Sequence, residues 1–439
     1  MKRILAGAFA VGVFAVAVNL ASAAPAHAQA LSAVPPGAVG LSGERLDDLS
    51  AVLAGHVQTG RLPGAVALVA REGRTAYLEA FGHRDRETGD PLEVDDIFRI
   101  ASQTKAVVSV AIMMLQEQGK LLISRPLGVY LPAFRETTVA IPGDGDAYEV
   151  VEARRPVTIR DLLTHTAGIG YGGGIAADRW EEAGIQGWYF ADREEPIAAT
   201  VERMAALPFD AHPGERFVYG YSTDILGAVV EAVSGLPLDD FLRIRIFEPL
   251  GMADTHFYLP PAKADRLSVV YSSGEEGLER APDPGRMVGQ GAYLEGPRTS
   301  FSGGAGLLST ARDYARFLQM MLNGGELDGV RILSPKTVEL MTVNHVGDLL
   351  EEGAPGTGFG LGFQVVEDLG ERGAPGSVGE YGWGGAYHSV YWVDPVEELV
   401  VVYFTQVIPA RRVQDHAELR AVVYGAIVDS RARTPARRR

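Results

Sequence analysis

The sequence contains no cysteine, which excludes disulfide bonds, thiolate zinc sites, a cysteine nucleophile and a lipid-modified cysteine. Lysine is also scarce, with 5 lysines beside 35 arginines, so a position that needs only a positive charge would be expected to hold arginine. After the first 28 residues, no apolar run approaches the 18 residues that a membrane-spanning helix needs. We therefore expect no stable membrane insertion.

Acidic residues outnumber basic residues over the whole chain, and the net charge is −16. Proteins that bind nucleic acids or anionic lipid surfaces do so through clustered lysine and arginine, so neither partner is expected. The basic tail at 431–439 is more typical of a solvated end than of a nucleic-acid arm. The 439 residues suggest roughly two or three structural units, and no internal repeat is present.

The first 28 residues have the pattern of a secretory signal peptide. Lys2 and Arg3 precede an apolar stretch at 4–18, and Ala26-His27-Ala28 supplies the small residues of a cleavage site. We predict cleavage after Ala28 and export to the periplasm or the medium. Retention as an uncleaved anchor is the alternative.

Residues 29–439 are predicted to form one domain of the α+β class. Strand-like runs occur near both ends, and helical patterns fill the middle. This order favours one antiparallel sheet built from both chain ends, flanked by the terminal helices, with an inserted helical region. The sheet part is expected at about 40–100 and 295–430, and the helical part at about 101–294, with a cleft between them. The expected strands are 64–70, 75–82, 358–366, 386–393 and 398–406, and the expected helices are 41–60, 100–120, 158–168, 197–206, 223–235, 238–247, 310–323, 334–342 and 413–428.

The tetrapeptide Ser102-Gln103-Thr104-Lys105 begins an apolar helix. A serine and a lysine three residues apart share one helix face. Burial and the positive end of the helix dipole both favour a neutral lysine, which could take the serine proton. The alternative is an ordinary N-cap serine followed by a chance lysine. The scarcity of lysine and the apolar neighbours of Lys105 argue against that alternative.

Two further segments contain candidate site residues. Tyr219 and Tyr221 lie on a loop just before the helix expected at 223–235, where a phenol near an ammonium could relay a proton. The segment 381–386 includes Trp383, Gly384 and Gly385 and is expected to form a turn that leads into a strand. Glycines there would let a ligand approach the backbone closely, and a backbone N–H could complete an oxyanion hole.

Together these segments resemble the serine β-lactamase-like superfamily, which contains class C β-lactamases, D-alanyl-D-alanine carboxypeptidases and family VIII carboxylesterases. The resemblance extends from about residue 40 to 428 and includes the segments at 158–169, 213–235, 246–257 and 302–325. It implies that fold, with an α/β sandwich and an inserted helical part. It also implies that Ser102 is the acylated nucleophile, Lys105 its base and Tyr219 the proton relay, with Tyr221 as the alternative relay. The backbone N–H groups of Ser102 and Ala386 would form the oxyanion hole.

Two departures from the superfamily pattern bear on substrate choice. Tyr221 occupies the asparagine position of the Y-x-N motif, and Trp383-Gly384-Gly385 replaces K-T-G. The missing lysine and asparagine would bind a substrate carboxylate and amide, so recognition of β-lactams and peptidoglycan peptides is in doubt. The pattern looks like that of family VIII carboxylesterases, with Trp383, Gly384, Gly385 and Tyr221 as expected substrate-binding residues.

Other catalytic patterns are absent from the sequence. There is no G-x-S-x-G elbow of an α/β-hydrolase, no HExxH motif and no EF-hand loop, so neither a metal nor a cofactor is expected. His165 is interpreted as structural, and His388 as a weaker candidate for a catalytic base. The glycine-rich run at 168–174 lacks a phosphate-loop lysine and is interpreted as a rim of the cleft.

The sequence thus predicts an exported serine hydrolase that cleaves small carboxylic esters through an acyl-enzyme. A β-lactamase or D,D-peptidase is one alternative. An acyltransferase, or a non-catalytic penicillin-recognition or cell-wall-binding module, is another. The oligomeric state is left open.

Overall fold

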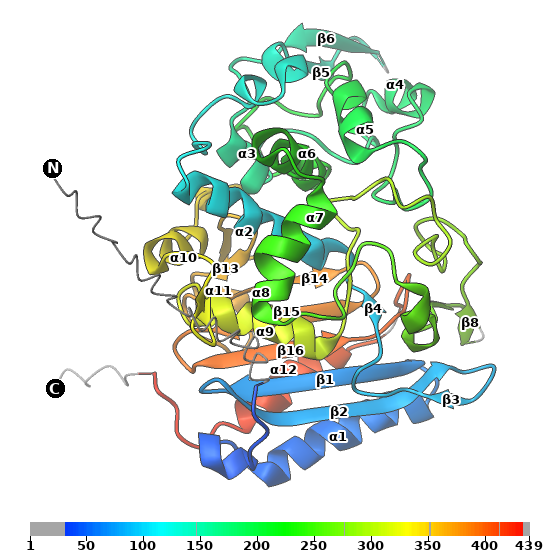
Figure 1. Ribbon diagram of the computed structural model, residues 1–439, viewed down its shortest axis with the longest axis vertical. Coiled ribbons are helices and arrows are strands. Elements are labelled where there is room, and N and C mark those ends of the chain that lie inside the picture. The colour runs from blue at the N-terminus through cyan, green and yellow to red at the C-terminus, as the bar shows by residue number, and fades with distance from the viewer. Residues whose placement is uncertain (1–30, 146, 276, 351–352, 412, 433–439) are drawn as a thin grey trace, which may run out of the picture.

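The computed structural model describes residues 31–432 except 146, 276, 351–352 and 412 (Figure 1). The predicted signal peptide at 1–28 lies outside the described residues. Within the described ranges, no helix is both long enough and apolar enough to cross a bilayer.

An eight-stranded sheet organises the lower half of Figure 1, with strand order β12-β13-β14-β15-β16-β1-β2-β3. Every neighbouring pair in it is antiparallel. The N-terminal strand β1 pairs with the C-terminal strand β16, so both chain ends build one sheet and the predicted fold class is confirmed. The strands of this sheet are β1 (Gly64–Arg71), β2 (Arg74–Asp85), β3 (Asp90–Pro91), β12 (Thr357–Phe359), β13 (Gln364–Val366), β14 (Tyr381–Gly385), β15 (Ser389–Asp394) and β16 (Leu399–Phe404).

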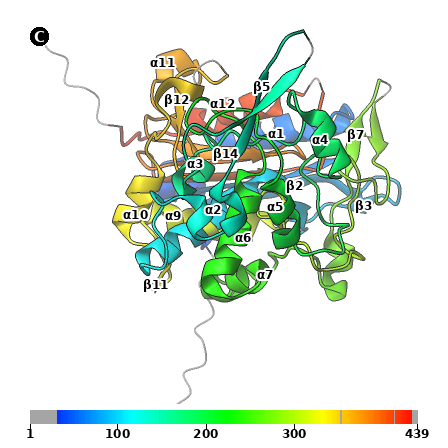
Figure 2. The same cartoon turned by 90° about the horizontal axis from the view of Figure 1, so that it is seen from above.

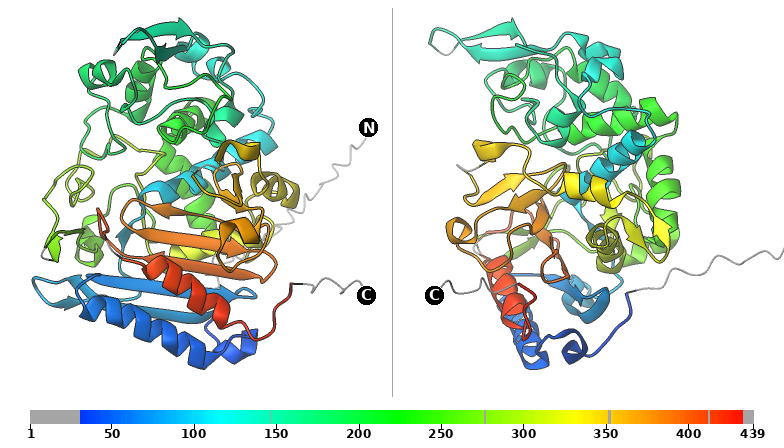
Figure 3. Two further views of the ribbon diagram at one scale, coloured as in Figure 1. Left: turned by 180° about the vertical axis from the view of Figure 1, so that it is seen from behind. Right: turned by 90° about the vertical axis from the view of Figure 1, so that its left-hand side faces the viewer.

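Strand β1 is buried along its whole length because helices cover both faces of the sheet. Val66, Leu68 and Ala70 belong to the core that contains α2 and α9. The alternate residues Ala65 and Ala67 pack with α1 and α12, which lie across the other face (Figure 3). The period-2 alternation of a strand thus supplies apolar side chains to two separate cores.

The α-helices begin and end close to the predicted positions in most cases. One difference concerns the helix predicted at 158–168, which ends at Leu163 because His165 has a φ of +55°. The helices are α1 (Gly43–Gln58), α2 (Thr104–Glu117), α3 (Ile159–Leu163), α4 (Ala177–Glu182), α5 (Ile197–Met204), α6 (Ser222–Ser234), α7 (Leu238–Leu242), α8 (Glu248–Leu250), α9 (Ala311–Leu322), α10 (Pro335–Met341), α11 (Leu369–Arg372) and α12 (Asp415–Gly425).

The middle segment of the chain lies above the sheet in Figure 1 and overlaps it when seen from above (Figure 2). Helix α2 lies between the two parts, and twelve consecutive residues from Thr104 to Leu115 are buried. The middle segment also contains small two-stranded sheets that the sequence did not predict. The short strands outside the large sheet are β4 (Phe98–Arg99), β5 (Thr138–Pro142), β6 (Tyr148–Glu152), β7 (Tyr271–Ser273), β8 (Leu278–Arg280), β9 (Leu308–Ser309), β10 (Glu326–Leu327) and β11 (Val330–Arg331).

Candidate active site

Ser102 lies where a strand turns into a helix, at the wall of a cavity of about 820 Å³. Strand β4 pairs with β9, and the chain then forms a 3₁₀ turn at Ala101–Gln103 that continues into α2. Ala101, directly before the serine, is fully buried with a φ of +43°. A residue with a Cβ atom is strained in this region of backbone space, typically by about 1–3 kcal/mol. The surrounding packing therefore holds the serine in one position.

Lys105 follows one turn later on the same helix face and is buried. Its Nζ donates to the carbonyl of Gly304 at 2.7 Å, to the Tyr171 hydroxyl at 3.1 Å and to Ser102 Oγ at 3.4 Å. These three acceptors match the three N–H bonds of an ammonium group. The S-x-x-K spacing therefore brings serine and lysine together as predicted.

The surroundings of Lys105 act on its pKa in opposite directions. Burial does lower the pKa of Lys105, but the phenol oxygens of Tyr171 and Tyr219 raise it. The buried Asp224 carboxylate raises it as well, and the net pKa of Lys105 lies above its usual value. Asp224 is tied to the same network because it accepts from the backbone N–H of Gly304 at 3.0 Å. These neighbours therefore oppose the lowering of the Lys105 pKa that burial alone would cause.

Tyr219 completes the polar cluster around Lys105. The lysine Nζ lies 4.6 Å from the centroid of the Tyr219 ring, and the Tyr219 oxygen accepts from the indole Nε1 of Trp383 at 3.0 Å. His165 packs behind this ring at 4.7 Å between centroids. Burial and the Lys105 charge hold the pKa of His165 well below its usual value, which fits the predicted structural role.

Trp383, Gly384 and Gly385 form part of β14, whereas the sequence predicted a turn that leads into a strand. Gly382, Trp383, Gly384 and Gly385 each pair with a residue of β15, because the sheet hydrogen bonds compensate for the low strand propensity of glycine. A Cβ atom at Gly385 would lie 2.6 Å from the carbonyl oxygen of Ile100, so only glycine lets β14 approach the segment before Ser102 so closely. Ser102 and Ala386 line the same cavity as the Trp383-Gly384-Gly385 segment.

Tyr221 lies behind the cavity wall and not on it. Its side chain is buried, its hydroxyl donates to the carbonyl of Gly187 at 2.8 Å, and its ring stacks on Trp180. The edge of its ring meets Tyr171 at 5.1 Å between centroids. Tyr221 was predicted to bind substrate, but it does not line the cavity. Its ring instead packs against Tyr171, which does.

Tyr171 is a site residue that the sequence analysis missed. It belongs to the glycine-rich run interpreted as a cleft rim, yet its hydroxyl contacts Lys105 and it lines the cavity. Burial raises the pKa of Tyr171 although Lys105 opposes this, so its hydroxyl stays protonated. The neighbouring Gly172 has a φ of +76°, which marks a tight turn, but no sequence pattern predicts that this turn brings Tyr171 to Lys105.

Comparison with known proteins identifies the family to which this chain belongs. A family model described as Beta-lactamase matches residues 49–424. Esterase EstB of Burkholderia gladioli is 34% identical over 379 residues, which is 81% of this chain and 89% of EstB. The solved structure of EstCE1, a hydrolase with promiscuous acyltransferase activity, is similar with a TM-score of 0.77 and 30% identity over 87% of this chain and 98% of EstCE1.

A LovD6 mutant of simvastatin synthase from Aspergillus terreus is also similar, with a TM-score of 0.73 and 25% identity over 88% of this chain and 98% of the synthase chain. The residues matched by the family model include the polar cluster and both segments of the large sheet. This chain therefore belongs to the Beta-lactamase family and is a serine hydrolase.

Proposed function

We propose that this protein hydrolyses carboxylic esters through an acyl-enzyme on Ser102. The observation that carries the proposal is that Ser102, Tyr219 and Trp383 line one cavity while the buried Lys105 contacts both Ser102 and Tyr219. The similarity to EstB and EstCE1 supports an ester as the substrate.

In the reactive form of the proposed enzyme, Lys105 and Tyr219 together hold one proton fewer than an ammonium and a phenol. Ser102 Oγ attacks the ester carbonyl carbon, and the Ser102 proton takes that vacant position on the Lys105–Tyr219 pair. The negative oxygen of the tetrahedral intermediate accepts from the backbone N–H groups of Ser102 and Ala386. The carbon–oxygen bond to the alcohol then breaks, and the alcohol leaves with the proton from Tyr219. Water attacks the acyl-enzyme in the same way, releasing the acid and restoring Ser102.

Substrate choice depends on the position where related enzymes that bind carboxylates have a lysine. Here Trp383 directs its indole N–H to the Tyr219 oxygen and offers no charge to a substrate carboxylate. Arg372 and Arg420 line the same cavity, but both are paired with the buried Glu380. A missing charge-assisted hydrogen bond costs about 1.5–3 kcal/mol, or about 10- to 100-fold in kcat/KM. Neutral esters are therefore expected to react faster than anionic lactams.

The test is a panel of p-nitrophenyl acetate and butyrate, nitrocefin, ampicillin and a D-Ala-D-Ala peptide. Ser102→Ala is expected to abolish turnover of every substrate. Ser389→Ala is the matched control because Ser389 lines the same cavity and its hydroxyl has no hydrogen-bond partner within the described chain. Activity that survives Ser102→Ala refutes the mechanism. A kcat/KM for ampicillin that equals or exceeds that for p-nitrophenyl butyrate favours the lactamase alternative. Faster product formation with added alcohol would indicate acyl transfer.

Export belongs to the same proposal and rests on the signal-peptide pattern alone. Expression of the full chain in a bacterium should yield a mature protein that begins at Gln29 in the periplasm or the medium. An intact N-terminus in the cytoplasmic fraction, measured by mass spectrometry, contradicts it.

A further inference from the structure

The turn between β14 and β15 holds the backbone N–H of Ala386 and has three residues, Ala386, Tyr387 and His388. Gly385 pairs with Ser389 across it, and the N–H of His388 donates to the Gly385 carbonyl at 3.0 Å. His388 closes the turn with a φ of +64°. In hairpins of this length that position is typically glycine, so histidine there introduces backbone strain. Another interaction must hold this residue in place.

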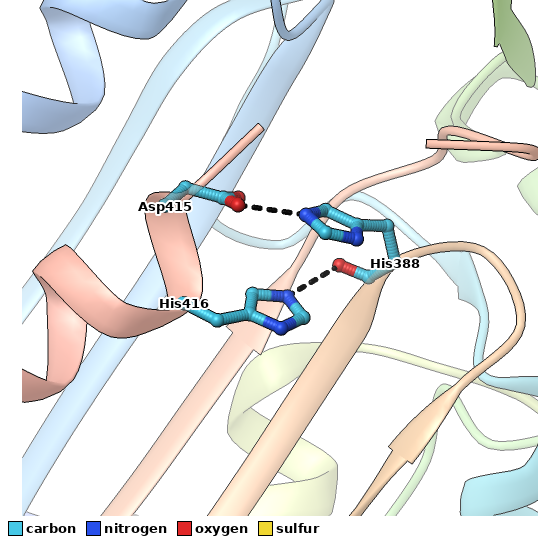
Figure 4. A group of neighbouring side chains, drawn as sticks. All are labelled: His388, Asp415 and His416. Atoms are coloured by element: carbon cyan, nitrogen blue, oxygen red, sulfur yellow. Dashed lines mark hydrogen bonds and ion pairs between the residues drawn. The ribbon is translucent and has the colours of Figure 1, made fainter. Parts of the chain in front are cut away.

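Helix α12 supplies that interaction from its first two residues (Figure 4). The imidazole Nε2 of His388 donates to Asp415 Oδ1 at 2.7 Å, and Nε2 of His416 donates to the carbonyl of His388 at 3.2 Å. The two imidazole rings stack with centroids 4.1 Å apart and planes 14° from parallel. The turn is therefore held by both a side chain and a main-chain atom of His388.

Asp415 is itself fixed from the other side. Its side chain is fully buried, and its second oxygen accepts from the Tyr403 hydroxyl of β16 at 2.6 Å. The carbonyl of Tyr387 in the same turn accepts from the backbone N–H of Val407 at 3.1 Å. The turn thus has contacts to α12 and to the segment after β16, which leaves little freedom for Ala386.

The same three side chains, His388, Asp415 and His416, lie close enough together to suggest a metal centre. A metal ion bound to imidazole lies in the plane of the ring, and the planes of two rings stacked 4.1 Å apart at an angle of 14° meet only far outside metal–ligand distance. Both oxygens of Asp415 already accept hydrogen bonds. The arrangement fits a hydrogen-bonded clamp better than a metal site.

We propose that Asp415 and His416 are positioning residues that act through His388 to hold the Ala386 N–H against the reacting carbonyl. This inference rests on the proposed function, in which Ala386 is an oxyanion donor. His388 and His416 line the same cavity as Ser102, so the clamp borders the reaction site directly. It would act on the transition state more than on ester binding, because the oxyanion exists only after Ser102 attacks.

The decisive variant is His388→Gly, because glycine relieves the backbone strain and removes the imidazole contact to Asp415. We expect the melting temperature to be unchanged or raised, kcat for p-nitrophenyl butyrate to fall about 10- to 100-fold and KM to change less than about 3-fold. Affinity for a trifluoromethyl ketone, which forms a tetrahedral oxyanion on Ser102, should fall in parallel with kcat. A folded variant with kcat within about 3-fold of wild type overturns the proposal.

Asp415→Ala tests the clamp from the α12 side, with Glu418→Ala as its matched control. Glu418 lies one turn later on α12 and accepts from His56 of α1 at 2.6 Å, so it is also part of a histidine–carboxylate pair, but it does not line the cavity. We expect Asp415→Ala to lower kcat and Glu418→Ala to leave it unchanged. Equal losses in both variants overturn the proposal. Turnover that survives Ser102→Ala would instead refute the proposed function.

Discussion

Trp383→Phe is expected to lower kcat without unfolding the protein. The indole ring packs against Phe359 and Tyr219, both at 5.4 Å between centroids, and phenylalanine keeps most of this contact. What it removes is the Nε1–H that donates to the Tyr219 oxygen at 3.0 Å. During proton transfer that oxygen gains negative charge, and a hydrogen bond to a charged group contributes about 1.5–3 kcal/mol. The corresponding loss in kcat is about 10- to 100-fold.

Steady-state kinetics with p-nitrophenyl butyrate measures this loss, and Trp392→Phe is the control. Trp392 lines the same cavity, but its indole N–H has no hydrogen-bond partner among the residues described, so its removal should leave kcat unchanged. If Trp383→Phe keeps kcat within about 3-fold of wild type, the indole N–H does not assist Tyr219. Equal losses in both variants would point to cavity shape and refute the reasoning.

Two further predictions concern the contacts of Lys105. Lys105→Arg should lose nearly as much kcat as Lys105→Ala. A guanidinium cannot give up its proton, and it cannot reach three acceptors from one nitrogen. A Lys105→Arg variant that keeps a tenth of wild-type kcat contradicts this prediction. Tyr171→Phe should lower kcat about 2- to 10-fold, because it removes one hydrogen bond of Lys105, at 3.1 Å, while the other two and the ring contacts remain. An unchanged kcat in Tyr171→Phe, with a wild-type melting temperature, would mean that this hydroxyl only fills space.

The sheet could be predicted because its central strands are buried on both faces. Residues 64–70 and 399–404 are continuous apolar runs, and such runs near the two chain ends favour one shared sheet. The Ser102–Lys105 contact could be predicted because helix periodicity alone places both side chains on one face. Both successes rest on local patterns.

The missed features depend on contacts between distant residues. β14 is a strand although it contains three glycines, because β13 and β15 supply its hydrogen-bond partners. Tyr171 reaches Lys105 across 66 residues of sequence, and no local pattern encodes that distance. The pKa of Lys105 likewise depends on Asp224, which raises it from a distant position in the sequence.

Backbone strain concentrates around the proposed oxyanion hole. Seven non-glycine residues in the described part of the chain have positive φ, and three of them, Ala101, His165 and His388, adjoin site residues. Ala101 precedes Ser102, and His388 closes the turn that contains Ala386, so each proposed N–H donor has a strained neighbour. A strained conformation persists only where surrounding contacts determine it fully. Ala101 is held by complete burial, and His388 is held by its hydrogen bonds to Asp415 and His416 of α12. Ala101 and Tyr387 of the turn also belong to one buried cluster, so the two distant segments that carry the proposed N–H donors are packed against a common core.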